Sequence, residues 1–326
     1  MAAGGLFQRA EGPIAPTTAI LGGVPTMQVD VPITAICLIF FVFGAITHLR
    51  LHRLNSKRGH KFHLSDMVFD FCMVRNITCV MRLAWATQPT NNSIIVAALI
   101  FENAGVVVLF AVNAVLAQRV LRALHPNFGW RPIVGVFFTG ILISVPVIII
   151  WNIVNLTLSY FAIGPETTHD FLLFGSAYTT FLSLLPIFII IGGLSAPSAV
   201  LIEDFGTGSF IAKVLILLLA SSLLVAGTLT RLIGALVLYP FDAPGKVDSK
   251  VLFYITGFLL EIIVVYLYAI LRIDLRFHIP DGSRGPGDYS GMNVVETVET
   301  SDTATSNGDA TSLQSLVSRS SSIATK

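Results

Sequence analysis

The chain of 326 residues is rich in apolar side chains and poor in charge. Hydrophobic residues make up 54% of it and charged residues 12%, and the formal net charge is +1. An ordinary soluble domain carries about 25% charged residues, so lipid is the expected solvent for most of this chain. The charge balance also excludes a strongly basic nucleic-acid-binding protein, and we expect no nucleic-acid partner.

Seven apolar windows follow one another along the chain. A transmembrane helix needs about 20 mostly apolar residues, and the windows lie at about 31–49, 67–86, 94–118, 132–158, 171–191, 211–239 and 251–273. The second is the weakest because four charged residues lie in or beside it: Asp66, Asp70, Arg75 and Arg82. The sixth is too long for a perpendicular span and is expected either to tilt or to extend out of the membrane. The predicted fold class is all-α, a polytopic, multi-pass membrane protein with seven transmembrane helices in a domain over 31–279.

The two ends of the chain are polar. Residues 1–30 lack the basic, apolar and small-residue pattern of a cleaved signal peptide, and we predict an extracytoplasmic segment there. Residues 280–326 are rich in Ser, Thr, Asp and Gly, a composition that cannot bury a core and predicts a disordered cytosolic tail.

The basic residues predict the orientation, because short cytoplasmic loops are enriched in Lys and Arg. Eleven basic residues lie in loops 50–66 and 119–131 and after the last span: Arg50, Arg53, Lys57, Arg58, Lys61, Arg119, Arg122, Arg131, Arg272, Arg276 and Arg284. The opposite side has only Arg9, Lys246 and Lys250. We therefore predict that the N-terminus lies outside and the C-terminus lies in the cytosol. Loop 192–210 fits less well, since it has acidic residues and no basic one.

One glycosylation sequon lies in a loop on the predicted outer side. It reads Asn91-Asn92-Ser93, which makes Asn91 a candidate glycosylation site. An unmodified polar turn explains the same residues equally well.

Five charged residues fall inside the predicted spans, where a charge costs several kcal/mol and needs a partner or a water-filled cavity. They are Arg75, Arg82, Glu102, Arg231 and Glu261. At about 1.5 Å of rise per residue they share one layer in the outer half of the membrane. We expect Glu102 to lie between Arg75 and Arg82 in depth, and Arg231 to pair with Glu261, which leaves one arginine over.

Two interpretations of this layer stay open. In the first, the pairs only hold helices together. In the second, the surplus arginine faces a cavity and binds an anionic group such as a phosphate or carboxylate.

No sequence pattern indicates catalysis, a cofactor or a metal. Zincin, nucleophile-elbow and P-loop motifs are missing, and we expect a protein that is not an enzyme. The three cysteines, at positions 37, 72 and 79, fall in apolar windows and are expected to pack as small hydrophobic residues.

Three stretches resemble an uncharacterised fungal family of seven-span membrane proteins, catalogued as a domain of unknown function. They read RLHRLNSKRGHKF (50–62), RLAWATQPTN (82–91) and LRFHIPDGSRGPGDYS (275–290). This resemblance implies seven spans over about 30–290 and no activity. The architecture is also similar to the fungal resistance-to-aminocholesterol family of lipid-translocating exporters, but GTLTRLIGAL around Arg231 lacks the further Arg and Glu of that family.

The leading functional hypothesis is an integral membrane protein that binds or translocates an amphipathic, lipid-like substrate through a charged intramembrane cavity. Its expected partners are membrane lipids and an anionic amphipathic ligand. The alternatives are a seven-helix receptor-like signalling protein and a non-transporting membrane scaffold. The oligomeric state and the choice between plasma membrane and endomembrane stay open.

Overall fold

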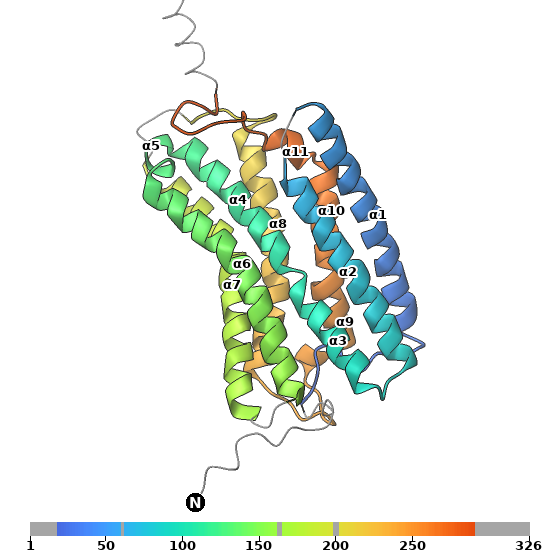
Figure 1. The fold of residues 1–326 in the computed structure, drawn as a ribbon. Coiled ribbons are helices and arrows are strands. Elements are labelled where there is room, and N and C mark those ends of the chain that lie inside the picture. The colour runs from blue at the N-terminus through green and yellow to red at the C-terminus, as the bar shows by residue number, and fades with distance from the viewer. Residues whose placement is uncertain (1–17, 60–61, 162–164, 198–201, 291–326) are drawn as a thin grey trace, which may run out of the picture.

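The computed structural model describes residues 18–59, 62–161, 165–197 and 202–290, and these residues are mostly helical with no strand. Figure 1 shows long helices lying side by side in one bundle, with α1 beginning at its lower end and α2 beginning at its upper end. These two ends of the bundle are called the lower and the upper end below.

The helices alternate in direction along the bundle (Figure 1). The long ones are α1 (Asp30–Lys57), α2 (Leu64–Thr87), α3 (Asn92–Ala104) continued by α4 (Val107–Leu124), α6 (Pro132–Phe161), α7 (Pro165–Ser195) and α8 (Phe210–Leu236). The last crossing is built from α9 (Lys250–Tyr254), the π-helical turn η2 (Ile255–Leu259) and α10 (Leu260–Ile270). Short helices lie between or after them: α5 (Pro126–Gly129), η1 (Lys246–Asp248) and α11 (Ile273–Arg276).

Six helical segments of the described chain are long and apolar enough to cross a membrane, which is consistent with a multi-pass membrane protein. They are Asp30–Lys57, Asn92–Leu124, Pro132–Phe161, His169–Ser195, Phe210–Leu236 and Lys250–Ile270. Their outer surface is apolar, since Ile133 and Ile270 are each 74% exposed. The second predicted span, 67–86, corresponds to α2 and is not among the six, because its charged residues lower its hydropathy.

Two of the predicted windows are interrupted. The window at 94–118 breaks at Gly105 and Val106, between α3 and α4, and the window at 251–273 contains the π-helical turn η2. Gly227 on α8 lies against this turn, where an added Cβ would come within 2.7 Å of the Thr256 carbonyl oxygen. Only glycine fits this close approach, which brings α8 and η2 into direct contact.

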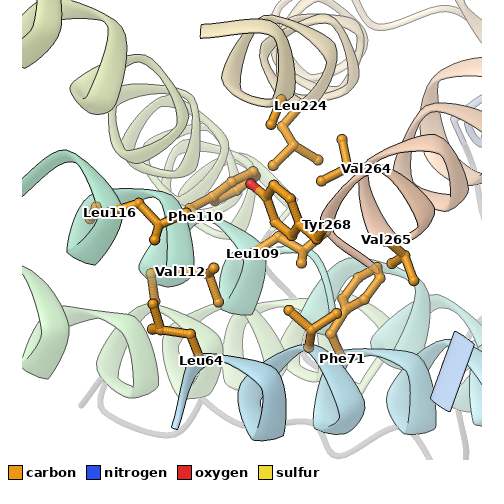
Figure 2. Packing of buried hydrophobic residues seen from close by; sticks show 14 of the residues in the cluster. Leu64, Phe71, Leu109, Phe110, Val112, Leu116, Leu224, Val264, Val265 and Tyr268 are labelled. Carbon is orange, nitrogen blue, oxygen red and sulfur yellow. The ribbon is translucent and has the colours of Figure 1, made fainter. Parts of the chain in front are cut away.

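The core joins α2, α4, α8 and α10. Figure 2 shows Phe71, Leu109, Leu224 and Val264 converging from these four helices around Tyr268. The Tyr268 hydroxyl donates to the Asn113 side chain, which in turn donates to Ser221 Oγ at 3.1 Å. These hydrogen bonds satisfy polar groups that lie where water is scarce.

Both polar ends of the described chain fold back onto the bundle. At the lower end, Ala19 N–H donates to the Tyr239 carbonyl and Gly22 N–H to the Asp248 carbonyl, so residues 18–29 cover the helix ends. At the upper end, residues 277–290 form a hook in which Tyr289 is 3% exposed and packs against Trp130 and Phe205.

The packed chain therefore extends to residue 290, beyond the boundary predicted at 280. The Pro, Gly and Ser residues of this stretch suggested disorder, but Tyr289 supplies a large apolar ring and Gly287 N–H donates to Glu203 Oε1 at 2.7 Å. The rest of the predicted tail, 291–326, and the start of the predicted N-terminal segment, 1–17, lie outside the described residues.

Replacing Tyr289 with alanine should release the hook. Loss of a buried aromatic side chain costs about 3 kcal/mol, so trypsin cleavage after the exposed Arg284 should rise roughly a hundredfold. Cleavage after Arg58, which is exposed at the same end of α1, is the internal control and should not change. Tyr289→Phe keeps the ring and should keep the protection. Equal cleavage in all three proteins would show that the hook does not depend on this ring.

Candidate functional site

The centre of the charged layer is a bidentate ion pair between α2 and α10. Arg75 Nε and Nη2 donate to Glu261 Oε2 and Oε1, each at 2.5 Å, and the two side chains are 0% and 2% exposed. Phe71 and Phe258 lie within 6 Å of the guanidinium carbon. A planar guanidinium that donates two parallel hydrogen bonds to a carboxylate is a strong, directional contact, and here it fixes the register of two helices.

The break between α3 and α4 places a free carbonyl beside this pair. The last carbonyls of a helix have no intrahelical partner; the Glu102 carbonyl near the end of α3 accepts from Arg75 Nη1 at 3.0 Å and from Arg231 Nη1 at 3.2 Å. The Phe101 carbonyl accepts from Thr78 Oγ1 at 3.0 Å. Gly105 allows the approach, because a Cβ there would lie 3.1 Å from Val74 and 3.7 Å from Arg75 Nε.

Arg82 forms the second part of the layer, nearer the lower end. Its Nη1 lies 3.4 Å from Glu102 Oε2, its Nη2 lies 3.2 Å from Asp30 Oδ1, and its Nε donates to the Tyr254 hydroxyl at 3.1 Å. Asp30 also pairs with Lys250 and accepts from the Tyr254 hydroxyl at 2.9 Å. Arg82 is 1% exposed and Asp30 is 0% exposed, so these charges are compensated inside the protein.

These contacts link α1, α2, α3, α8, α9 and α10 through one network, called the charged cluster below. It consists of Asp30, Arg75, Arg82, Glu102, Arg231, Lys250 and Glu261. The structure brings all five sequence-predicted residues into it. Glu102 lies between Arg75 and Arg82 and binds both, through its backbone and its carboxylate respectively.

The predicted Arg231–Glu261 pair was wrong. Glu261 pairs with Arg75 on the other side of α10, and Arg231 binds the Glu102 carbonyl. The sequence could not reveal this, because Arg75 and Glu261 are 186 residues apart and because the break at Gly105 opens the Glu102 carbonyl to Arg231.

Three further residues take part in these contacts although the sequence did not single them out for the charged layer: Asp30, Tyr254 and Lys250. Asp30 and Lys250 begin α1 and α9, at the edges of apolar windows where charges are ordinarily solvated. Tyr254 lies four residues after Lys250, on the same face of one helix, and that spacing is the only sequence signal that joins the two.

The contacts of the charged cluster lead inward to protein atoms. This favours the interpretation in which the charges hold helices together over the one in which an arginine faces a cavity.

A groove of about 470 Å³ lies in the upper half of the bundle. α4 contributes Ala111, Val115 and Arg119, while the start of α2 and the middle of α6 contribute the remaining walls: His63, Leu64, Met67, Leu142, Val145 and Pro146. The volume lies in the range of small-molecule sites. This lateral groove is apolar over most of its length and basic at its upper end.

Asn91 has a local structural role. Its side-chain oxygen accepts from the backbone N–H groups of Ser93 and Ile94, at 3.2 and 3.4 Å, and so caps α3. The residue is exposed, and its glycosylation stays a prediction. Among the described residues no group of His, Cys, Asp and Glu side chains is arranged to hold a metal ion, and the three cysteines are buried and free.

Residues 209–278 match a family model described as a protein of unknown function, DUF3112. The matched region runs from the start of α8 to the hook and contains Arg231, Lys250 and Glu261 of the charged cluster, together with Tyr254. This match fits the resemblance to an uncharacterised family. No curated protein and no solved structure matches the chain.

Exchanging the charges of the central pair should separate its structural role from a binding role. Arg75→Gln or Glu261→Gln leaves a buried charge without its partner and should lower the free energy of unfolding by about 3–5 kcal/mol. The double variant Arg75→Glu, Glu261→Arg should recover part of that loss. Thermal unfolding of the purified protein in detergent measures the effect, with Arg58→Gln on the exposed surface as a control. Single variants as stable as the wild type would contradict a structural pair.

Proposed function

We propose that this protein is an integral membrane protein that binds an amphipathic, lipid-like molecule in the lateral groove. The observation that carries the proposal is the shape and chemistry of this groove: apolar walls deep in the bundle and basic side chains at one end. Ala111 and Arg119 lie eight residues apart on α4, so the groove follows the helix for about 12 Å. That geometry suits an acyl chain lying along α4 with its polar end near Arg119 and His63.

The proposal includes a topology of seven spans with the lower end outside and the upper end in the cytosol. Support for α2 as a span comes from its two faces. Arg75 and Arg82 face inward and are satisfied there, whereas Met73, Ile77 and Val80 are 43%, 42% and 52% exposed and face away from the cluster. α2 has 24 residues, which extend about 36 Å, enough to cross the hydrocarbon core.

The orientation follows from the basic residues at the upper end. The stretch after α1, the end of α4 and the hook all lie at this end, and they carry most of the Lys and Arg outside the spans. Basic short loops remain on the cytosolic side during insertion. The groove would then open to the cytosolic leaflet.

Single cysteines on either side of α2 test this topology. The native cysteines are buried, so the background should be low. In intact cells, a membrane-impermeant thiol reagent should label Thr90→Cys and Asp242→Cys, and should label Ser56→Cys only after permeabilisation. Labelling of residues 56 and 90 from the same side would mean that α2 does not cross.

A groove-filling substitution tests the binding. Leu142→Trp on α6 should occupy the groove and abolish the thermal stabilisation that glycerolipids give to the wild-type protein. Its neighbour Ile143 is 61% exposed and does not line the groove, so Ile143→Trp is the matched control and should retain binding. If no lipid stabilises the wild type, or if lipids stabilise both variants equally, the groove is not a binding site. The receptor and scaffold alternatives would then be favoured.

A further inference from the structure

Arg119 lies between the lateral groove and a second cavity. The second cavity has a volume of about 140 Å³ and is walled by Phe62, Arg119 and the hook residues 278–283. The guanidinium of Arg119 packs over the Phe62 ring with its carbon 5.2 Å from the centroid. The sequence neighbours Phe62 and His63 line the small cavity and the groove respectively. The two spaces therefore meet at the Phe62–Arg119 contact.

The charge of Arg119 has no acidic partner in the described part of the chain. Its Nη1 donates to the Phe277 carbonyl at 2.5 Å, and no carboxylate described in the structure lies within 4 Å of its guanidinium nitrogens. This distinguishes it from Arg75 and Arg82, which are paired with carboxylates. A guanidinium has five N–H donors in a planar fork, so the carbonyl leaves donors for an anionic ligand.

In the proposed topology, Arg119 lies near the level of the cytosolic headgroups. It lies five residues before the end of α4 at Leu124, about 8 Å of helix. The groove extends from it toward the middle of the bundle, and the small cavity lies on its other side.

We propose that the small cavity binds the phosphate of a glycerophospholipid whose acyl chain occupies the lateral groove, with Arg119 as the ligand of the phosphate. This inference rests on the proposed function of the groove. Guanidinium groups match the geometry of phosphate oxygens and bind them bidentately. His278 also lines the cavity wall, and the wall is closed by the turn at 280–283.

One carboxylate in the wall opposes a purely anionic headgroup. Asp281 lines the small cavity, but it is exposed, so water and salt screen its charge. Removal of this charge should therefore strengthen phosphate binding modestly, in the direction opposite to the loss of Arg119.

The test measures binding to the full-length protein in detergent by native mass spectrometry and thermal shift. The probes are phosphatidic acid, diacylglycerol with the same acyl chains, and inorganic phosphate. Wild type should prefer phosphatidic acid to diacylglycerol by about tenfold or more, as expected for hydrogen bonds to a charged group, and inorganic phosphate alone should give no comparable shift. Arg119→Gln should remove the preference and retain diacylglycerol binding, whereas Arg119→Lys should keep part of the preference.

Two further variants keep the result interpretable. Arg122 is the matched control on α4, because it donates to the Gly129 carbonyl and stacks on Trp130; Arg122→Gln should leave the preference unchanged. Asp281→Asn should raise the affinity for phosphatidic acid about twofold, roughly the effect of one screened charge. If Arg119→Gln does not fold, the test rests on three proteins: the wild type, Arg119→Lys and Asp281→Asn. A wild type without a preference for phosphatidic acid over diacylglycerol, or variants that do not change this preference in the stated directions, would overturn the inference.

The binding results distinguish a wrong phosphate site from a wrong lipid groove. Equal binding of phosphatidic acid and diacylglycerol, both lost in Leu142→Trp, would keep the groove and overturn the phosphate site. Stabilisation by inorganic phosphate as strong as that by phosphatidic acid would replace the lipid by a free anion and overturn the inference. If no lipid binds, both the lipid groove and the phosphate site are wrong.

Discussion

A charge buried among packed helices must be compensated by the protein, and this constraint organises the bundle. α2 carries two arginines and is the long helix with too much charge to count among the apolar spans. Its place depends on acids supplied by other helices: Asp30 from α1, Glu102 from α3 and Glu261 from α10. The attraction between such charges offsets the free-energy cost of their desolvation only when the geometry is good and additional hydrogen bonds are formed. Here each arginine of α2 also donates to a backbone oxygen.

The irregular turns of the backbone are part of that compensation. A regular helix uses its own carbonyls, so an unbroken α3–α4 would offer little to the guanidinium groups of Arg75 and Arg231. The interruption at Gly105 releases the Glu102 carbonyl, and both arginines bind it. On the facing side, η2 precedes Glu261 by a single residue and lies against Gly227 of α8. π-Helical turns are rare and often lie at functional sites, and this one lies next to the central ion pair.

The helical fold class and the residues of the charged layer could be predicted from the sequence, because both depend on local composition. Apolar windows marked the helices, and charges inside them marked Arg75, Arg82, Glu102, Arg231 and Glu261. The pairing was not local: Arg75 and Glu261 are 186 residues apart, and their contact depends on two backbone irregularities without a clear sequence signature. Asp30 escaped notice because a charge at the first residue of a helix is normally solvated, and Tyr289 because one aromatic residue ordered a stretch of otherwise disorder-prone composition.

The two halves of the bundle differ in how their arginines are satisfied. In the lower half, Arg75 and Arg82 meet carboxylates, and the charge of Arg231 is offset by Glu102 and Glu261 nearby. Near the upper end, Arg119 has a carbonyl and an aromatic ring but no described carboxylate, and it borders both cavities. The carbonyl that accepts from Arg119 is neutral and does not compensate the positive charge. A bound anion would compensate it, as carboxylates of the protein do for Arg75 and Arg82 in the charged cluster. In the proposed function, the closed lower half would keep the helices in register while a lipid enters and leaves the groove above it.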